Sequence, residues 1–201
     1  MNKKEISLLC GLVLTVIFSC CCQDIKTAVT ICQDTLRLHI IANSNSPADQ
    51  QTKLEVRDAI LAMEDILPEN CTDFATAVNR VQTDLARTEQ RINSIMAQKG
   101  TGYTARCSVE KFWFDTTQYA DFVLPQGEYT ALTVRLGKAE GKNWWCVVYP
   151  SLCTQSCGEV KAETADFITT QTITPRFKVA EIYQQIKYKL TQNKTPRYTN
   201  G

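Results

Sequence analysis

The hydrophobic pattern of this chain changes its period near residue 100, and that change constrains the fold more than any other feature. Over residues 74–95, apolar side chains recur at alternating steps of four and three, which predicts an amphipathic helix. Gly100 and Gly102 end it, and from Tyr103 the pattern alternates between apolar and polar, which predicts a half-buried strand. The helical stripe consists of Phe74, Val78, Val81, Leu85, Ile92 and Ile95, with Thr88 in its one polar position. We expect the stripe to pack against a sheet rather than against the helix of a partner.

A short strand and a capped helix are expected before this stripe. Residues 36–41 are mostly apolar and end in β-branched residues, which favours a buried strand. Ser46 can cap the next helix, Pro47 suits its first position, and Pro68 ends it. The apolar face of that helix would carry Val56, Ile60, Met63 and Leu67.

Two later strands are expected to pair directly with each other. Residues 128–136 alternate in polarity, residues 137–141 contain two glycines, and residues 144–149 are apolar on both faces. The pattern predicts an antiparallel hairpin whose second strand is central in the sheet. Together the elements predict an α+β fold, a single compact domain with a mostly antiparallel sheet of about four strands and two helices packed on one face.

The N-terminal residues have the order of an export signal. Two lysines precede an apolar run over residues 6–18, which ends at Ser19. About 13 apolar residues are short for a helix that spans a bilayer, so residues 1–22 are interpreted first as a signal peptide. If the next three cysteines are counted, the run reaches about 17 residues, and an uncleaved membrane anchor stays open. Cleavage before Cys20 with lipidation of its thiol is a third possibility.

Beyond the export segment, we expect a domain over residues 33–153 followed by two further segments. Residues 154–175 are rich in Thr, Ser, Gln and Glu and are interpreted as a linker. Residues 176–201 carry six basic side chains against one acid and contain an amphipathic helix, predicted over residues 177–190. Its apolar side would carry Val179, Ile182, Ile186 and Leu190. This helix could dock on the domain, touch an anionic membrane or meet a partner, and a solvated basic tail is equally consistent with the pattern.

Ten cysteines in 201 residues indicate an oxidising compartment once the chain is exported. Cys146 and Cys153 are the pair that we expect to form a disulfide, because Pro150 can turn the chain between them. The alternative, that both are small buried apolar groups, stays open. No metal site is expected, since Cys153 and Cys157 have ligand-like spacing but no second such pair follows.

The sequence offers little for catalysis. Its single histidine, His39, lies inside an apolar strand, where we expect a packed residue rather than a base. There is no glycine-rich phosphate loop, no His-Glu-x-x-His pair and no Gly-x-Ser-x-Gly elbow, so no cofactor is expected. The formal net charge of +1 argues against a nucleic-acid-binding protein. An exported thiol-active or hydrolytic enzyme that uses Cys146 or Cys153 is the alternative class.

Aromatic side chains are the stronger candidates for function, as binding groups. Trp144 and Trp145 are neighbours on one predicted strand and must face opposite ways, so only one can enter a core covered on a single side. The other is available to anchor a partner, unless the linker or the final helix covers it. Further candidates for partner binding are Asn143, Tyr129 and the turn residues Asn43, Ser44 and Asn45.

Four blocks of the sequence resemble the stage II sporulation protein R family. They are residues 37–46, 53–59, 121–136 and 143–153, and the resemblance covers roughly residues 35–157. They include Arg-Leu-His-Ile-Ile-Ala-Asn-Ser-Asn-Ser in the first block and Asn-Trp-Trp-Cys in the last. Four blocks in the right order are more specific than any single short motif.

The resemblance implies a signal rather than a catalyst. Members of this family are made in the forespore of an endospore-forming bacterium and exported into the space between forespore and mother cell. There they trigger a membrane-embedded aspartic protease of the mother cell, which cleaves the inactive precursor of a sigma factor. For this chain the resemblance implies that protease as partner, with the protein either secreted or anchored through residues 1–22.

Overall fold

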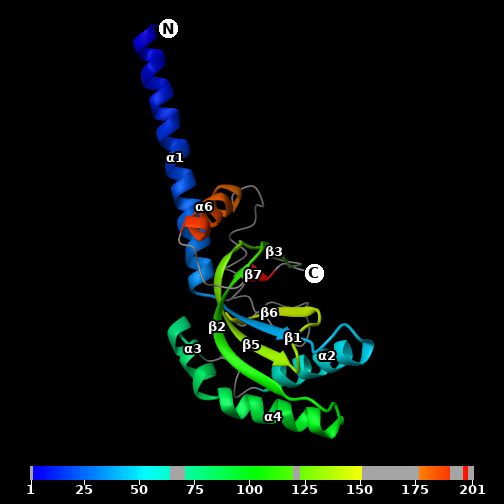
Figure 1. Cartoon of the computed structure of the whole chain (residues 1–201). Helices are drawn as coiled ribbons and strands as arrows, with labels where there is room; N and C mark the ends of the chain where they lie inside the picture. The colour runs from blue at the N-terminus through cyan, green and yellow to red at the C-terminus, as the bar shows by residue number, and fades with distance from the viewer. Residues whose placement is uncertain (1, 64–70, 120–122, 151–176, 191–196, 199–201) are drawn as a thin grey trace.

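The computed structural model describes residues 2–63, 71–119, 123–150, 177–190 and 197–198, and the linker predicted over residues 154–175 lies outside them. A long N-terminal helix projects from a domain in which helices pack on a sheet (Figure 1). The helices are α1 (Lys3–Gln33), α2 (Pro47–Leu61), α3 (Phe74–Thr83), α4 (Leu85–Gln98) and α6 (Phe177–Leu190). The strands are β1 (Leu36–Ile41), β2 (Ala105–Phe114), β3 (Thr117–Gln118), β4 (Val123–Leu124), β5 (Gly127–Leu136), β6 (Asn143–Tyr149) and β7 (Arg197–Tyr198). The predicted α+β class is confirmed.

The main sheet has the strand order β6-β1-β5-β2-β7. β1 is parallel to β5 and antiparallel to β6, and β2 is antiparallel to β5 over its whole length. β7 adds two residues beside the end of β2, while β3 and β4 form a separate pair. Four long strands therefore build the sheet, as expected, and antiparallel ladders make up the larger part of it.

The predicted hairpin is wrong, because β1 lies between its two strands. β5 and β6 run in opposite directions, but each of them pairs with β1. All six side chains of β1 are buried, which suits a central strand, whereas β6, expected to be central, is an edge strand within the described residues. Residues 137–142 pass over the end of β1, where the backbone N–H of Gly141 donates to the carbonyl of Ala42 at 2.9 Å.

Helices α2, α3 and α4 cover one face of the sheet (Figure 1). The stripe predicted over residues 74–95 does face this core, where Val81 and Ile92 are buried. The prediction of one helix is wrong, because Asp84 is both the C-cap of α3 and the N-cap of α4. The chain bends at this residue, so two short helices follow the curved sheet with one continuous apolar side.

The start of α2 follows the sequence signals, and its end does not. The Ser46 hydroxyl accepts a hydrogen bond from the backbone N–H of Asp49 at 3.2 Å, with proline at the first helical position, as expected. The helix ends at Leu61, well before Pro68. Met63, just beyond this end, is still buried.

The opposite face of the sheet packs against α1 and α6. Ala28 and Cys32 of α1 and Ala180 of α6 join a cluster with Phe112 and Tyr129 of the sheet. Periodicity and composition did not predict that the N-terminal helix would continue to residue 33 and enter the core. The other half of α1 stands free, since every described side chain over residues 2–20 is exposed.

Candidate functional site

The sheet face turned away from α2, α3 and α4 carries many polar and aromatic side chains beside a few aliphatic ones. Alternation along each strand produces this, because Leu38 and Ile40 of β1 pack on the helix side. We call the other side the polar–aromatic face, which consists of Arg37, His39, Ser108, Glu110, Phe112, Phe114, Thr133, Arg135, Asn143 and Trp145.

His39 lies at the centre of this face and is fully buried. Its ring stacks on Trp145 with centroids 3.6 Å apart and meets Phe112 edge-on at 5.5 Å. Its Nε2 lies 3.0 Å from Oδ1 of Asn143, and because an amide oxygen only accepts, Nε2 carries the ring proton. Burial lowers the pKa of His39 to about 3, so the imidazole is neutral at physiological pH. It is a packed residue, as the sequence predicted.

Arg37 is a buried cation without an acidic partner among the described residues. Its side chain is fully buried, and its Cζ lies 4.0 Å from the ring centroid of Phe114 and 5.2 Å from that of Tyr129. Nη2 donates to the hydroxyl of Tyr119 at 3.1 Å, while Nε and Nη1 have no hydrogen-bond partner in the part of the chain that the structure describes. Aromatic faces stabilise a guanidinium in part, but a buried charge normally requires a counter-charge.

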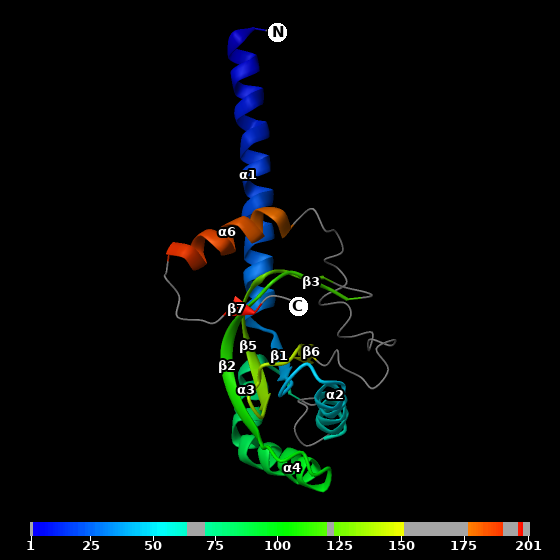
Figure 2. The same ribbon diagram turned by 45° about the vertical axis from the view of Figure 1, so that its right-hand side comes forward.

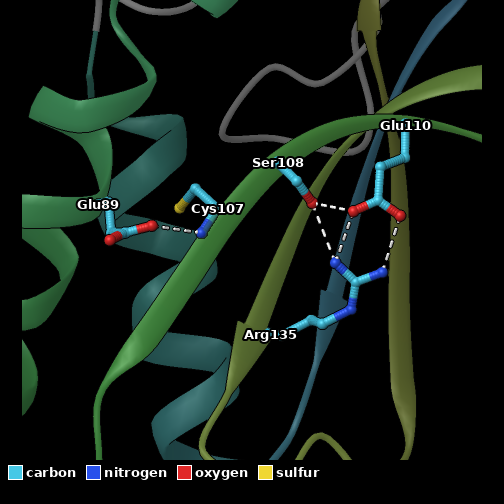
Figure 3. Close-up of polar contacts among 5 residues, drawn as sticks. All are labelled: Glu89, Cys107, Ser108, Glu110 and Arg135. Carbon is cyan, nitrogen blue, oxygen red and sulfur yellow. Dashed lines mark hydrogen bonds and ion pairs between the residues drawn. The ribbon is translucent and has the colours of Figure 1, made fainter.

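A third group of polar side chains, Ser108, Glu110 and Arg135, lies on the β2 and β5 part of the polar–aromatic face (Figure 3). Arg135 donates to both carboxylate oxygens of Glu110, at 2.8 and 2.9 Å, and to the Ser108 hydroxyl at 2.9 Å. Hydrogen bonding from Arg135 lowers the pKa of Glu110. On the other side of the same strand, the backbone N–H of Cys107 donates to Glu89 of α4 at 2.7 Å, which fixes that helix to the sheet.

The tandem tryptophans lie on opposite faces, as alternation predicted. Trp145 stacks on His39 and meets Phe114 edge-on at 4.8 Å on the polar–aromatic face. Trp144 packs at the margin of the helix-covered core, where Cζ of Arg57 lies 5.3 Å from its ring centroid. Both indoles are half-buried. Each therefore keeps some surface on edge strand β6, and a role in partner binding stays a prediction.

The polar turn after β1 is held by Asp49. The Asp49 carboxylate accepts from the side chains of Asn43 at 2.9 Å, Ser44 at 2.5 Å and Tyr103 at 2.5 Å. These bonds, that from Ser44 first, lower the pKa of Asp49 to about 2. The turn is thus held by a hydrogen-bond network that joins β1, α2 and the residues just before β2.

The same turn fastens residues 137–142 as they cross β1. Oδ1 of Asn43 accepts from the backbone N–H of Lys138 at 2.9 Å, and Oδ1 of Asn45 accepts from that of Lys142 at 2.8 Å. These bonds give Asn43 and Asn45 a structural task, and their expected part in partner binding is untested. Sequence reasoning missed this task because the acceptor and donor are almost a hundred residues apart.

Two further candidates for partner binding are placed differently. Tyr129 is fully buried, and its hydroxyl donates to the carbonyl of Pro125 at 2.5 Å, so its side chain offers no surface to a partner in this fold. Asn143 is half-buried and holds His39, and its carbonyl lies 3.4 Å from Nζ of Lys53. Lys53 also donates to the carbonyl of Lys142 at 3.1 Å, so α2 secures the start of β6.

The cysteines on the strands and in the core of the domain offer little reactive thiol. Cys146 is disulfide-bonded; its expected partner, Cys153, lies outside the described residues, so the pairing stays a prediction. Burial raises the pKa of the free thiols of Cys32 and Cys107 to about 12 in each case. Within the described part of the chain, no three His, Cys, Asp or Glu side chains are grouped so that they could hold a metal ion.

Comparison with known proteins identifies the family of this chain. The family model described as stage II sporulation protein R matches residues 32–159. The chain belongs to the stage II sporulation protein R family. It is 34% identical over 140 residues to the stage II sporulation protein R of Bacillus subtilis (strain 168), an alignment that covers 69% of this chain and 62% of that relative, less than two thirds of its length. No solved structure gives a significant match.

The family match also divides this member of the stage II sporulation protein R family into parts. The matched residues 32–159 contain the whole polar–aromatic face and the Asp49 turn network. The exposed half of α1 precedes them, and α6 follows them. Sequence reasoning located the matched blocks but missed Arg37 as a site residue, although a charge that alternates with leucines in an apolar strand was a usable signal.

Proposed function

We propose that this protein is an exported sporulation signal, made in the forespore, that activates a membrane-embedded aspartic protease of the mother cell and so leads to cleavage of a sigma-factor precursor. The observation that carries the proposal is the family membership, since residues 32–159 match the family as one block. This matched block coincides with a domain that is packed on both faces of its sheet.

The N-terminal helix supports export to a membrane surface. α1 is long and apolar enough to cross a membrane by its length and composition, criteria that a signal sequence near the N-terminus also meets. No described residue packs around its first half, while its second half is fixed to the domain. We propose that α1 remains attached and holds the domain at the membrane, on the intermembrane side.

The chemistry of the described residues favours a binding function over catalysis. A thiol nucleophile needs a lowered pKa and a nearby base, and the free thiols of Cys32 and Cys107 have raised pKa values. The imidazole of His39 is enclosed by aromatic rings. Cys146, which the alternative enzyme would use, has no thiolate while it is disulfide-bonded.

We place the contact with the protease at β6. This strand lies at an edge of the sheet within the described residues, and edge strands can accept a partner's strand. Trp144 is half-buried beside that edge, and tryptophans of this kind often carry much of the binding energy of an interface. The cation–π contact with Arg57 holds the indole in a defined orientation before binding.

The proposal is tested in cells that produce the full chain, the aspartic protease and the sigma-factor precursor, with precursor cleavage followed by immunoblot. We expect cleavage with the wild-type chain and none when a catalytic aspartate of the protease is replaced. Trp144→Ala should reduce cleavage at unchanged protein level, and Trp144→Phe should restore much of it, because a ring remains at the edge. If the folded, exported wild-type chain leaves the precursor intact, the protein is not the activator.

A further inference from the structure

Helix α6 is amphipathic, but its apolar side does not pack on its own domain. Its polar side faces the sheet: Thr116 donates to the Glu181 carboxylate, Gln126 donates to the Glu181 carbonyl at 2.7 Å, and Gln185 donates to Gln126 at 3.2 Å. Gln184 is buried on this side, and the ring of Tyr188 lies 4.6 Å from that of Trp113. The helix is therefore fixed to the domain by polar contacts.

The apolar side of α6 points away from the domain. At 100° per residue, its members are centred on the side opposite to the docking residues. They are Val179, Ile182, Tyr183, Ile186 and Leu190, with exposed fractions between 41% and 79%. Lys187 and Lys189 lie at the two edges of this stripe. The predicted amphipathic helix is thus confirmed, and its apolar side, for which docking, membrane contact and partner binding were all open, is exposed.

The position of α6 relative to α1 indicates what covers the stripe. α6 crosses α1 where α1 leaves the domain, and the exposed half of α1 projects beyond it (Figure 2). Because the docking side of α6 faces the sheet and α1, the apolar stripe is turned away from the domain at the level where the exposed half of α1 begins. The projecting segment offers about 17 mostly apolar residues, or roughly 25 Å of helix, against ~30 Å for the hydrocarbon core of a bilayer.

We propose that α6 lies in the interface of the membrane that α1 enters, with its stripe against the acyl chains and its lysines at the level of the anionic headgroups. This inference rests on the membrane placement of α1 given under the proposed function. An interfacial helix needs a large apolar side, basic flanks and an orientation parallel to the membrane, and α6 combines them at the foot of a membrane-length helix.

A second copy of the chain fits the stripe less well. A helix of 14 residues is about 21 Å long, so one side of it provides much less than the ~800 Å² that each partner of a stable pair buries. The bilayer needs no such area from α6 alone, because α1 supplies the main attachment. The two helices together would fix the tilt of the domain on the membrane. Edge strand β6 would then lie at a defined distance from the membrane surface.

Lipid cross-linking of the full chain tests this inference. The chain is reconstituted in vesicles of phosphatidylglycerol and phosphatidylethanolamine, with photoreactive p-benzoylphenylalanine at one position at a time. Ile186 reports on the stripe, and its neighbour Gln185, also exposed but on the docking side, is the matched control. Val13 in the projecting half of α1 reports on the anchor itself. We expect lipid adducts from positions 186 and 13 and none from position 185.

Each other outcome overturns the inference in a distinct way. Adducts from position 13 without adducts from position 186 would leave the anchor in place and remove α6 from the membrane. An absence of adducts at both positions would refute the anchoring in the proposed function as well. Cross-links between two copies through position 186 would make the stripe a self-association surface, and equal lipid labelling at positions 185 and 186 would show that α6 has left the domain.

A second variant separates membrane contact from folding. Ile182→Gln combined with Ile186→Gln removes apolar side chains that are already exposed, so thermal unfolding should not change. Lipid adducts from a photoreactive group at Tyr183 should then be lost, while those from position 13 persist. Retention of the adducts at position 183 in this variant would show that the stripe does not hold α6 at the bilayer.

Discussion

The imidazole of His39 and the indole of Trp145 lie parallel within 24°, with their ring centroids 3.6 Å apart. They are directly opposite each other in the register of β1 and β6. This stack is therefore a consequence of β1 entering between β5 and β6, and it ties the last strand of the family domain to the first.

Removing each tryptophan should have a different effect on stability. Trp145→Ala should lower the free energy of unfolding by about 3 kcal/mol, because the indole packs against the buried His39 and against Phe114. Trp144→Ala should lower it by about 1 kcal/mol, since that ring lies at the core margin and contacts Arg57. Urea unfolding measures both. Equal losses would mean that the two faces of β6 are packed alike.

Stability should depend on pH through His39. Its pKa is lowered from 6.5 to about 3 in the folded chain, so between these values the unfolded chain binds the proton and the folded chain does not. The contribution to stability is complete above pH 6.5 and decreases as the pH falls, by up to about 1.4 kcal/mol per pH unit. His39→Gln should remove this slope while leaving precursor cleavage intact. Urea unfolding of both proteins from pH 7 to pH 4 measures the difference, and parallel curves would contradict the assignment.

The segment of residues 137–142, which passes over the end of β1, should be sensitive to substitution of Gly137. This glycine has φ +55°, and a Cβ would clash with the Asn43 side chain that accepts from Lys138. Gly137→Ala should therefore lose more stability than Gly102→Ala, where φ is +71° but nothing lies within 4 Å. The control should cost about 1 kcal/mol from backbone strain alone. Similar melting temperatures for the two variants would show that the turn can move away from Asn43.

The burial of the Arg37 guanidinium should lower the free energy of unfolding. Among the described residues, Nε and Nη1 of the buried Arg37 have no hydrogen-bond partner, so its loss of hydration is only partly compensated and Arg37→Met should keep the free energy of unfolding or raise it by about 1–4 kcal/mol. Denaturant unfolding gives the value, and the cleavage assay shows whether the guanidinium has a separate role in signalling. A loss of several kcal/mol would mean that Arg37 has a counter-charge in the folded protein.

Cysteine alkylation should divide the described thiols into two groups. Cys32 and Cys107 should resist alkylation in the native protein, because burial raises their pKa values to about 12. Among the free thiols beyond residue 22, Cys71 should react first, because it is half-buried and lies outside the helices and strands. Cys146 should react only after reduction, and we expect peptide mapping to identify Cys153 as its partner. Rapid alkylation of Cys146 without reductant would restore the thiol-enzyme alternative.

Local features of the sequence were enough to predict most of the longer elements and which of their sides are apolar. The change of period near residue 100 separated helices from strands, Ser46 marked the start of α2, and the helix expected over residues 177–190 is α6. Alternation placed Trp144 and Trp145 on opposite sides. Each of these depends on neighbours within a few residues, where side-chain periodicity and capping chemistry act directly.

Only the tertiary structure decided which elements meet. The insertion of β1 between β5 and β6 depends on backbone pairing between residues about a hundred positions apart, and an apolar pattern is equally compatible with a local hairpin. Periodicity also revealed the apolar side of α6, but the polar groups around Gln126 determined that the other side would dock. The burial of Arg37 has the same origin, because the rings that enclose it come from β2 and β5 rather than from its own strand.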